Sequence, residues 1–214
     1  HFKTERQKER HAELVLKQEK SKEIVLSDTC IAYLMEHYAW VTQKMVSVSK
    51  EMDIDYLNKG KIQEPEGISL LSIVDGVEYT KYEGERIYND FLSGLPDIFK
   101  GEFIMQAKKI TDLKNSWDYP CFLKKVNTPV DTNNKVQIQG YMDITGAPDG
   151  EVADVLTNMP ETIINDYRRK LLYKMNVVTD QDPNYLRAVR EMENSMIFDN
   201  IPRHMRVFKK KVEP

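Results

Sequence analysis

The stretch SGLPDIFKGEFIMQAKKITDLK, residues 93–114, decides the fold because it predicts two strands that carry acidic side chains. One β-compatible segment lies near each end of the stretch, and the turn residue Gly101 lies between them. Asp97 belongs to the first segment, whereas Asp112 and Lys114 end the second. Side chains two residues apart on a strand project from the same face. If the two strands are neighbours, these three side chains meet at one end of a sheet.

Two carboxylates beside an amine suit a cation and a phosphate. Carboxylate oxygens are the ligands that a hard ion such as Mg²⁺ prefers. A neighbouring lysine orients or activates a water molecule and stabilises negative charge that develops on a phosphate. Asp112-Leu113-Lys114 is the only acid-x-Lys triplet in the chain, which makes the pattern more specific. The structural alternative is an exposed ion pair at a strand end and an unrelated aspartate in a turn.

Hydrophobic periodicity and turn residues divide the rest of the chain into elements. Helices are expected at about 27–48 with a core-facing side, from Pro65, at 135–144, from Pro160, and at 183–196. We expect a chain break near 58–60, strands within 77–113 and at 151–156, a long loop at 115–134 and a basic tail at 203–211. This order predicts an α/β fold, with a small mixed central sheet flanked by helices.

Length and composition favour one folded domain. The chain has 214 residues, of which 41% are hydrophobic and 30% charged. Residues 1–25 are expected to form a polar helix or arm, and residues 26–214 a single domain. The longest apolar run, at 30–35, is far shorter than the roughly 20 residues of a membrane span. The first ten residues are too charged for a secretory signal, so we expect a cytoplasmic protein without membrane contact.

A net charge of −3 gives no overall positive field, so a nucleic acid would have to be held by local patches. The two cysteines cannot form a disulfide framework and have no partners at zinc spacing. The chain also lacks the glycine-rich phosphate loops of nucleotide-driven motors.

Two further motifs accompany the acidic strands. Gln137 and Tyr141, in QIQGY, are one turn apart on a predicted helix, and Gly60 precedes Glu64 in GKIQEPE. Together with the Pro-Asp pair and the acid-x-Lys triplet, these motifs resemble the PD-(D/E)XK nuclease superfamily, in its RecB-like and phage lambda-type exonuclease branch. The likeness runs from about residue 26 to 208, with the motifs in the family's order. It implies a restriction-endonuclease-like core.

The resemblance implies a set of metal ligands. Asp97, Asp112 and the backbone carbonyl of Leu113 would bind a divalent ion. Glu64 would complete the ligand set, directly or through water. Because a proline follows Glu64 directly, this glutamate lies at a helix start, and Glu66 is a competing candidate. A first-turn acid favoured by the helix dipole is the structural alternative for Glu64.

The resemblance also implies how the catalytic amine works. Lys114 would position or activate the attacking water. Gln137 would hold that lysine or the DNA phosphate in register, and Tyr141 would support it. Packing on an ordinary helix is the alternative for both residues of the QxxxY motif.

Several residues near the end of the second acidic strand are expected to contact DNA. A lysine pair would contact phosphates, and a tryptophan would stack on a DNA end or else anchor the core. The expected contact residues are Lys124, Lys125, Trp117 and Ser116.

The activity that the resemblance implies is a DNA exonuclease that depends on Mg²⁺, with Mn²⁺ as an alternative ion. It would act on duplex ends in phage-type recombination within a bacterial host cell. A single-strand annealing protein and a homo-oligomer are the expected partners. A structure-specific endonuclease and an inactive DNA-binding protein on the same fold are the alternatives.

Overall fold

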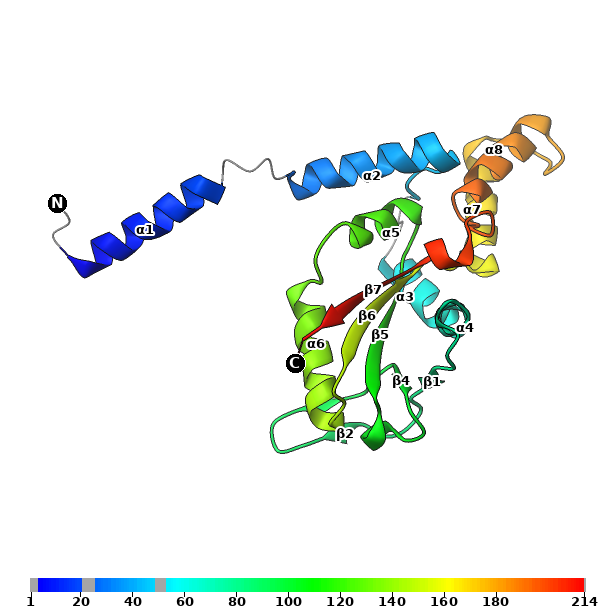
Figure 1. Ribbon diagram of the computed structural model, residues 1–214. Coiled ribbons are helices and arrows are strands. Elements are labelled where there is room, and N and C mark those ends of the chain that lie inside the picture. The colour runs from blue at the N-terminus through cyan, green and yellow to red at the C-terminus, as the bar shows by residue number, and fades with distance from the viewer. Residues whose placement is uncertain (1–3, 21–25, 49–52, 214) are drawn as a thin grey trace.

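A computed structural model describes residues 4–20, 26–48 and 53–213, and a five-stranded mixed sheet lies at its centre (Figure 1). The sheet has the strand order β1-β4-β5-β6-β7. Its strands are β1 (Thr80–Lys81), β4 (Ile98–Lys100), β5 (Lys109–Asn115), β6 (Gly150–Val155) and β7 (Val207–Val212). β5 and β6 are parallel and the other pairs antiparallel. β2 (Ile87–Tyr88) and β3 (Ser93–Gly94) form a separate hairpin. The expected mixed α/β sheet is confirmed.

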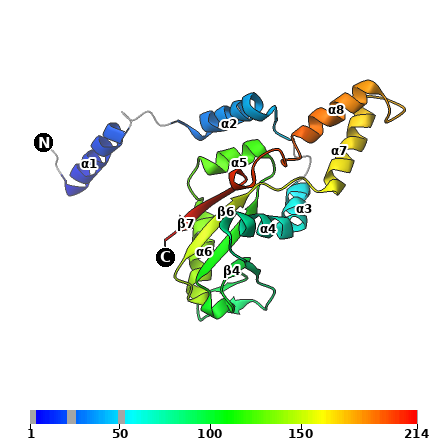
Figure 2. The same cartoon turned by 45° about the vertical axis from the view of Figure 1, so that its right-hand side comes forward.

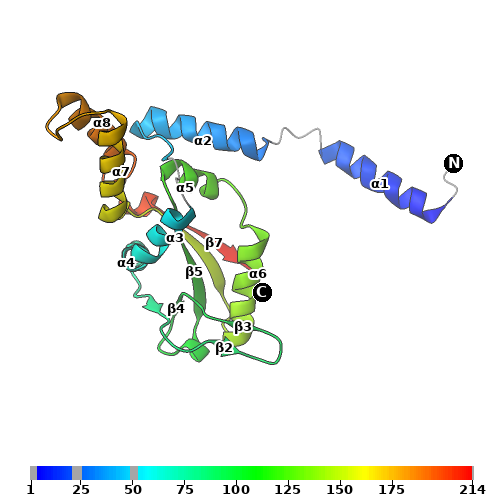
Figure 3. The ribbon, with the colours of Figure 1, turned by 180° about the vertical axis from the view of Figure 1, so that it is seen from behind.

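Helices pack on both faces of the sheet. α6 (Thr132–Thr145) packs Ile138 and Met142 on β5 and β6. It approaches closely, because a Cβ at Gly150 would lie 2.4 Å from the sulfur of Met142. α4 (Glu64–Asp75) covers the other face, with Leu71 in a cluster beneath it. Figures 2 and 3 show the two helices on opposite sides of the central strands.

The shortness of β4 opens an edge of the sheet. β4 pairs with β5 only from Lys109 to Thr111. The remaining β5 residues, 112–115, have β6 on one side and, within the described part of the chain, no strand on the other. The end of β5 therefore borders open space, and it carries the acid-x-Lys triplet.

The other helices lie around the end of β5 and beyond it. They are α1 (Glu5–Lys20), α2 (Asp28–Gln43), α3 (Asp53–Ile62), α5 (Tyr119–Val126), α7 (Glu161–Lys174) and α8 (Pro183–Asn194). α2 lies across α5 on the side away from the sheet, and α7 and α8 form an antiparallel pair (Figures 1 and 3). Among the described residues, no helix is both long enough and apolar enough to cross a bilayer.

Three expectations for these segments are wrong. Residues 115–134 are not one loop, because Asp118 accepts a hydrogen bond from the amide of Cys121 at 2.8 Å and so caps α5. The chain does not break at 58–60, since α3 runs through it. The basic tail is instead the edge strand β7, whose lysines at 209, 210 and 211 form ion pairs with aspartates.

The first expected core helix is present but buries little of its apolar side in the core. Ser27 caps α2 by accepting a hydrogen bond from the amide of Cys30 at 3.2 Å, as its pattern predicts. However, Leu34, Tyr38 and Val41 are exposed, and Ala39 is the buried residue of the helix. Helical spacing shows that one face is apolar, but it does not show what covers that face.

Candidate active site

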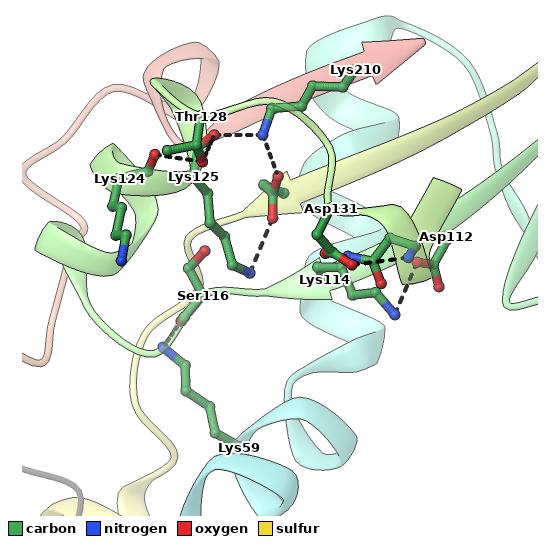
Figure 4. Close-up of polar contacts among 11 residues, drawn as sticks. Lys59, Asp112, Lys114, Ser116, Lys124, Lys125, Thr128, Asp131 and Lys210 are labelled. Carbon is green, nitrogen blue, oxygen red and sulfur yellow. Dashed lines mark hydrogen bonds and ion pairs between the residues drawn. The ribbon is translucent and has the colours of Figure 1, made fainter. Parts of the chain in front are cut away.

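Asp97, Asp112 and Lys114 converge at the open edge of β5, as the sequence predicts. Asp97 lies just before β4, and its Oδ2 accepts a hydrogen bond from the amide of Leu113 at 3.1 Å. Asp112 and Lys114 project from one face of β5, with Nζ of the lysine 2.9 Å from Oδ2 of the aspartate (Figure 4). The hydrogen bond and the ion pair together fix two carboxylates and one ammonium around the same point.

The surroundings of this group set its charge. Burial, followed by the proximity of the Asp112 carboxylate, raises the pKa of Asp97 to about 7. Burial alone would lower the pKa of Lys114, but the carboxylates of Asp112 and Asp97 raise it above its ordinary value. Lys114 therefore carries its proton at neutral pH, whereas Asp97 is poised to gain or lose one.

The donor set fits a divalent cation. Both carboxylate oxygens of Asp112 are buried, and within the described residues neither accepts a hydrogen bond of good geometry. Buried carboxylate oxygens require compensation by hydrogen bonds or positive charge. The Leu113 amide points to the open edge, because it donates to Asp97. The amide and carbonyl of one strand residue face the same neighbour, so the Leu113 carbonyl also faces that edge.

A cleft of about 430 Å³ lies beside these residues. β5 contributes one wall, and the end of α3 with the first turn of α4 contributes the other. The lining residues are Tyr56, Leu57, Gly60, Lys61, Glu64, Asp97, Leu113, Lys114 and Asn115. The helices α3 and α4, which precede β1, therefore bring Gly60 and Glu64 to the acidic strands.

Of the two competing glutamates, Glu64 lines the cleft. Its carboxylate pairs with the Lys81 ammonium at 2.9 Å. Glu66 instead has Arg206, Asp199 and Lys59 as its charged neighbours, and burial raises its pKa. No three His, Cys, Asp or Glu residues in the described ranges gather closely enough to hold one ion. Glu64 thus faces the aspartate pair without joining it.

The QxxxY motif lies next to the cleft. Gln137 Nε2 donates a hydrogen bond to Tyr141 Oη at 2.9 Å, so the two side chains share one face of α6 as expected. Tyr141 lies close enough to Lys114 to influence its pKa. The chain before Asp97 packs on this tyrosine, since a Cβ at Gly94 would lie 2.6 Å from its ring. The motif therefore borders Lys114.

The expected DNA contacts are brought together only in part. Trp117 is 1% exposed, and its indole donates to the carbonyl of Val48 at 2.8 Å, so it anchors the core and does not present a ring for stacking. Ser116 is fully buried. Lys125 pairs with the buried Asp154 at 3.0 Å, whereas Lys124 is exposed (Figure 4).

Sequence reasoning missed three residues around the cleft. Lys61 lines it as an exposed cation, Asn115 lines it from β5, and Lys59 is buried behind it. Lys61 belongs to the GKIQEPE motif found in the sequence, but this motif does not indicate whether Lys59 or Lys61 faces the cleft. No signal in the sequence distinguishes the buried lysine from the exposed one.

No family model and no curated protein matches this chain. Two solved structures are similar to it. One is a phage-related exonuclease from Haemophilus somnus 129PT, with 21% identity over 88% of this chain and 73% of that chain, and a TM-score of 0.48. The other is the alkaline exonuclease LHK-Exo from Laribacter hongkongensis, with 13% identity over 89% and 72%, and a TM-score of 0.43. Both of these proteins are named exonucleases. Because both TM-scores are below 0.5, the function is inferred from the residues of the cleft.

Proposed function

We propose that this protein is a Mg²⁺-dependent DNA exonuclease that hydrolyses phosphodiester bonds. The observation that carries the proposal is the group formed by Asp97, Asp112 and Lys114 at the edge of an open cleft. Two carboxylates on their own would repel each other, and a divalent ion relieves that repulsion. The adjacent ammonium suits a reaction in which negative charge develops on a phosphate.

The side chains would divide the work as follows. Asp97, Asp112 and the Leu113 carbonyl would hold the ion, which supplies positive charge to the phosphate when bound. Asp97 would give up its proton when the ion binds. Lys114 is an ammonium here, so it is suited to donate hydrogen bonds to the attacking water or a phosphate oxygen and not to remove a proton. Gln137 and Tyr141 would restrain its position.

Preference for DNA ends, and a place in phage-type recombination with an annealing protein, are parts of the proposal that rest on the sequence resemblance. The cleft supports DNA as a substrate through Lys61 and Lys114, which can face phosphates on opposite walls. Activity as a homo-oligomer in the cytoplasm of a bacterial cell completes the proposal.

The test is digestion of an end-labelled linear duplex and a covalently closed circle, each with Mg²⁺, Mn²⁺ or EDTA. We expect the linear duplex to shorten from its ends with either ion, the circle to survive, and EDTA to stop the reaction. Cleavage of the circle would indicate an endonuclease. DNA binding without hydrolysis under any divalent ion would indicate an inactive DNA-binding protein, and would refute the enzyme.

A further inference from the structure

Lys59 is a fully buried lysine, 0% exposed, on α3 directly behind the cleft wall. Its ammonium donates hydrogen bonds to the carbonyl oxygens of Ser116 at 2.7 Å, Trp117 at 2.9 Å and Thr157 at 2.9 Å. An ammonium group has three N–H bonds, and here each meets a backbone carbonyl. Ser116 and Trp117 follow β5, and Thr157 follows β6, so one side chain joins α3 to the ends of both strands. Figure 4 shows the contact with Ser116.

A second set of hydrogen bonds closes around the same point. Asn115 Nδ2 donates to the carbonyl of Gly60 at 3.4 Å, and Thr157 Oγ1 donates to Asn115 Oδ1 at 3.0 Å. The backbone carbonyl of Lys59 accepts from the amide of Gln63 at 2.9 Å, where α3 passes into α4. These contacts link the wall that carries Lys61 and Glu64 to the wall that carries Lys114.

We propose that Lys59 is a positioning residue, whose buried ammonium fixes the end of β5 against α3 and so holds the two cleft walls at the separation that the site requires. This inference rests on the proposed function for its catalytic consequence. The structural consequence, an ordered end of β5, does not depend on it.

Keeping a charge at this position is unfavourable. Burial lowers the pKa of Lys59 to about 7, although Asp118, Glu66 and Cys121 act to raise it and Lys125 adds to the lowering. A methionine of similar length would fill the same space beside Phe198 without that penalty. The carbonyls of Ser116, Trp117 and Thr157 would then lack a donor, which accounts for a lysine at this position.

The test compares Lys59→Met with Val212→Ala, a core variant on the distant edge strand β7. Each protein is measured at the same interval below its own melting temperature. In Lys59→Met we expect amide exchange to accelerate about tenfold in residues 112–118 and 57–62 but not in the α6 segment 135–144. We also expect Mn²⁺, titrated alone by electron paramagnetic resonance, to bind about tenfold more weakly. Val212→Ala should leave both quantities unchanged.

Hydrolysis provides the third measurement. We expect kcat to fall about 10- to 100-fold in Lys59→Met with little change in KM, because misplaced groups lose rate more than substrate binding. If Lys59→Met does not fold, Thr157→Val removes the hydrogen bond from Thr157 Oγ1 to Asn115, which supports the same two walls, and should shift exchange and Mn²⁺ affinity in the same direction by a smaller factor. Unchanged exchange or unchanged Mn²⁺ affinity would overturn the inference. An inactive unmutated protein would refute the proposed function, and the first two measurements would still decide on Lys59.

Discussion

The ammonium of Lys114 lies 2.9 Å from Oδ2 of Asp112, two residues earlier on β5. This ion pair neutralises one of two adjacent carboxylates. Under the proposed function, a divalent ion would take over that role and would leave Lys114 available for the substrate.

Removing this amine should slow hydrolysis strongly without weakening metal binding. In Lys114→Ala we expect the rate of duplex digestion to fall about 100- to 1,000-fold, the range for losing one positive group at a developing charge. Mn²⁺ affinity should stay within a few-fold, since the lysine is not a ligand. Lys174→Ala, at the exposed end of α7, is the matched control and should digest DNA normally. Equal activity in the two variants would contradict the role of Lys114.

The aspartate pair predicts how the stability of the metal-free protein depends on pH. The pKa of Asp97 is about 7 in the folded protein, against an ordinary value of 3.8. Between these values the folded protein binds more protons than the unfolded chain, so the free energy of unfolding should fall as pH rises from about 4 to about 7. Above about pH 7 the contribution is constant. Asp97→Asn should remove this part of the slope.

Chemical denaturation in EDTA measures the effect as the difference between the unmutated protein and Asp97→Asn. Taking the difference matters because Lys59 and Glu66 also have shifted pKa values. If the two proteins show parallel stability curves across this pH range, Asp97 does not retain its proton in the folded state.

Metal binding should turn the two adjacent carboxylates from a destabilising feature of the folded protein into a stabilising one. Saturating Mg²⁺ or Mn²⁺ should raise the melting temperature of the unmutated protein. At an ion concentration 100 times Kd, the free energy of unfolding should rise by about 2.7 kcal/mol. Asp112→Asn should lose most of this metal-induced rise in melting temperature. Without metal, at about pH 8, the variant should be more stable than the unmutated protein, because one of two buried like charges is gone. Differential scanning fluorimetry with and without EDTA records both. A full metal-dependent shift in Asp112→Asn would place the ion elsewhere.

Much of this arrangement is readable in the sequence, and what is not readable depends on tertiary contacts. The triplet at 112–114 is local, because strand alternation alone places its acid and its lysine on one face. The closeness of Asp97 to the triplet needed only neighbouring strands, and β4 and β5 follow one another along the chain and pair antiparallel. In contrast, α3 contains Asn58 and Gly60, which are typical of turns, and its contacts with β5 and α4 override that preference.

Burial was the property least accessible to sequence reasoning. Trp117 follows a charged motif, and its position near the site suggested a stacking role, but it packs instead with Met159 and Ile163. Lys59 and Lys61 are two residues apart, yet one is fully buried and the other lines the cleft. A lysine is normally solvated, so nothing in the composition of this segment indicates three carbonyl oxygens converging on one of them.

The two glutamates at the start of α4 can be separated experimentally. Glu64→Gln should weaken Mn²⁺ binding about 10- to 100-fold, the range for a group that orients or supports metal ligands, because this carboxylate lines the cleft opposite Asp97. Glu66→Gln should bind Mn²⁺ normally, because its charged neighbours, Arg206 and Lys59, lie outside the cleft lining. The reverse result would show that α4 presents the other glutamate to the ion.

The lysines near the cleft should differ in how they respond to salt. Lys61→Ala should weaken binding of a short duplex to the metal-free protein and lower the salt dependence of that binding by about one phosphate contact, since Lys61 is exposed on the cleft wall. Lys125→Ala should act differently, because its ammonium neutralises the buried Asp154, and its loss should lower the melting temperature instead. Fluorescence anisotropy at several salt concentrations, together with thermal denaturation, distinguishes the two effects. A salt dependence unchanged by Lys61→Ala would show that Lys61 does not contact DNA. A Lys125→Ala protein of normal stability that binds DNA weakly would show that Lys125 does.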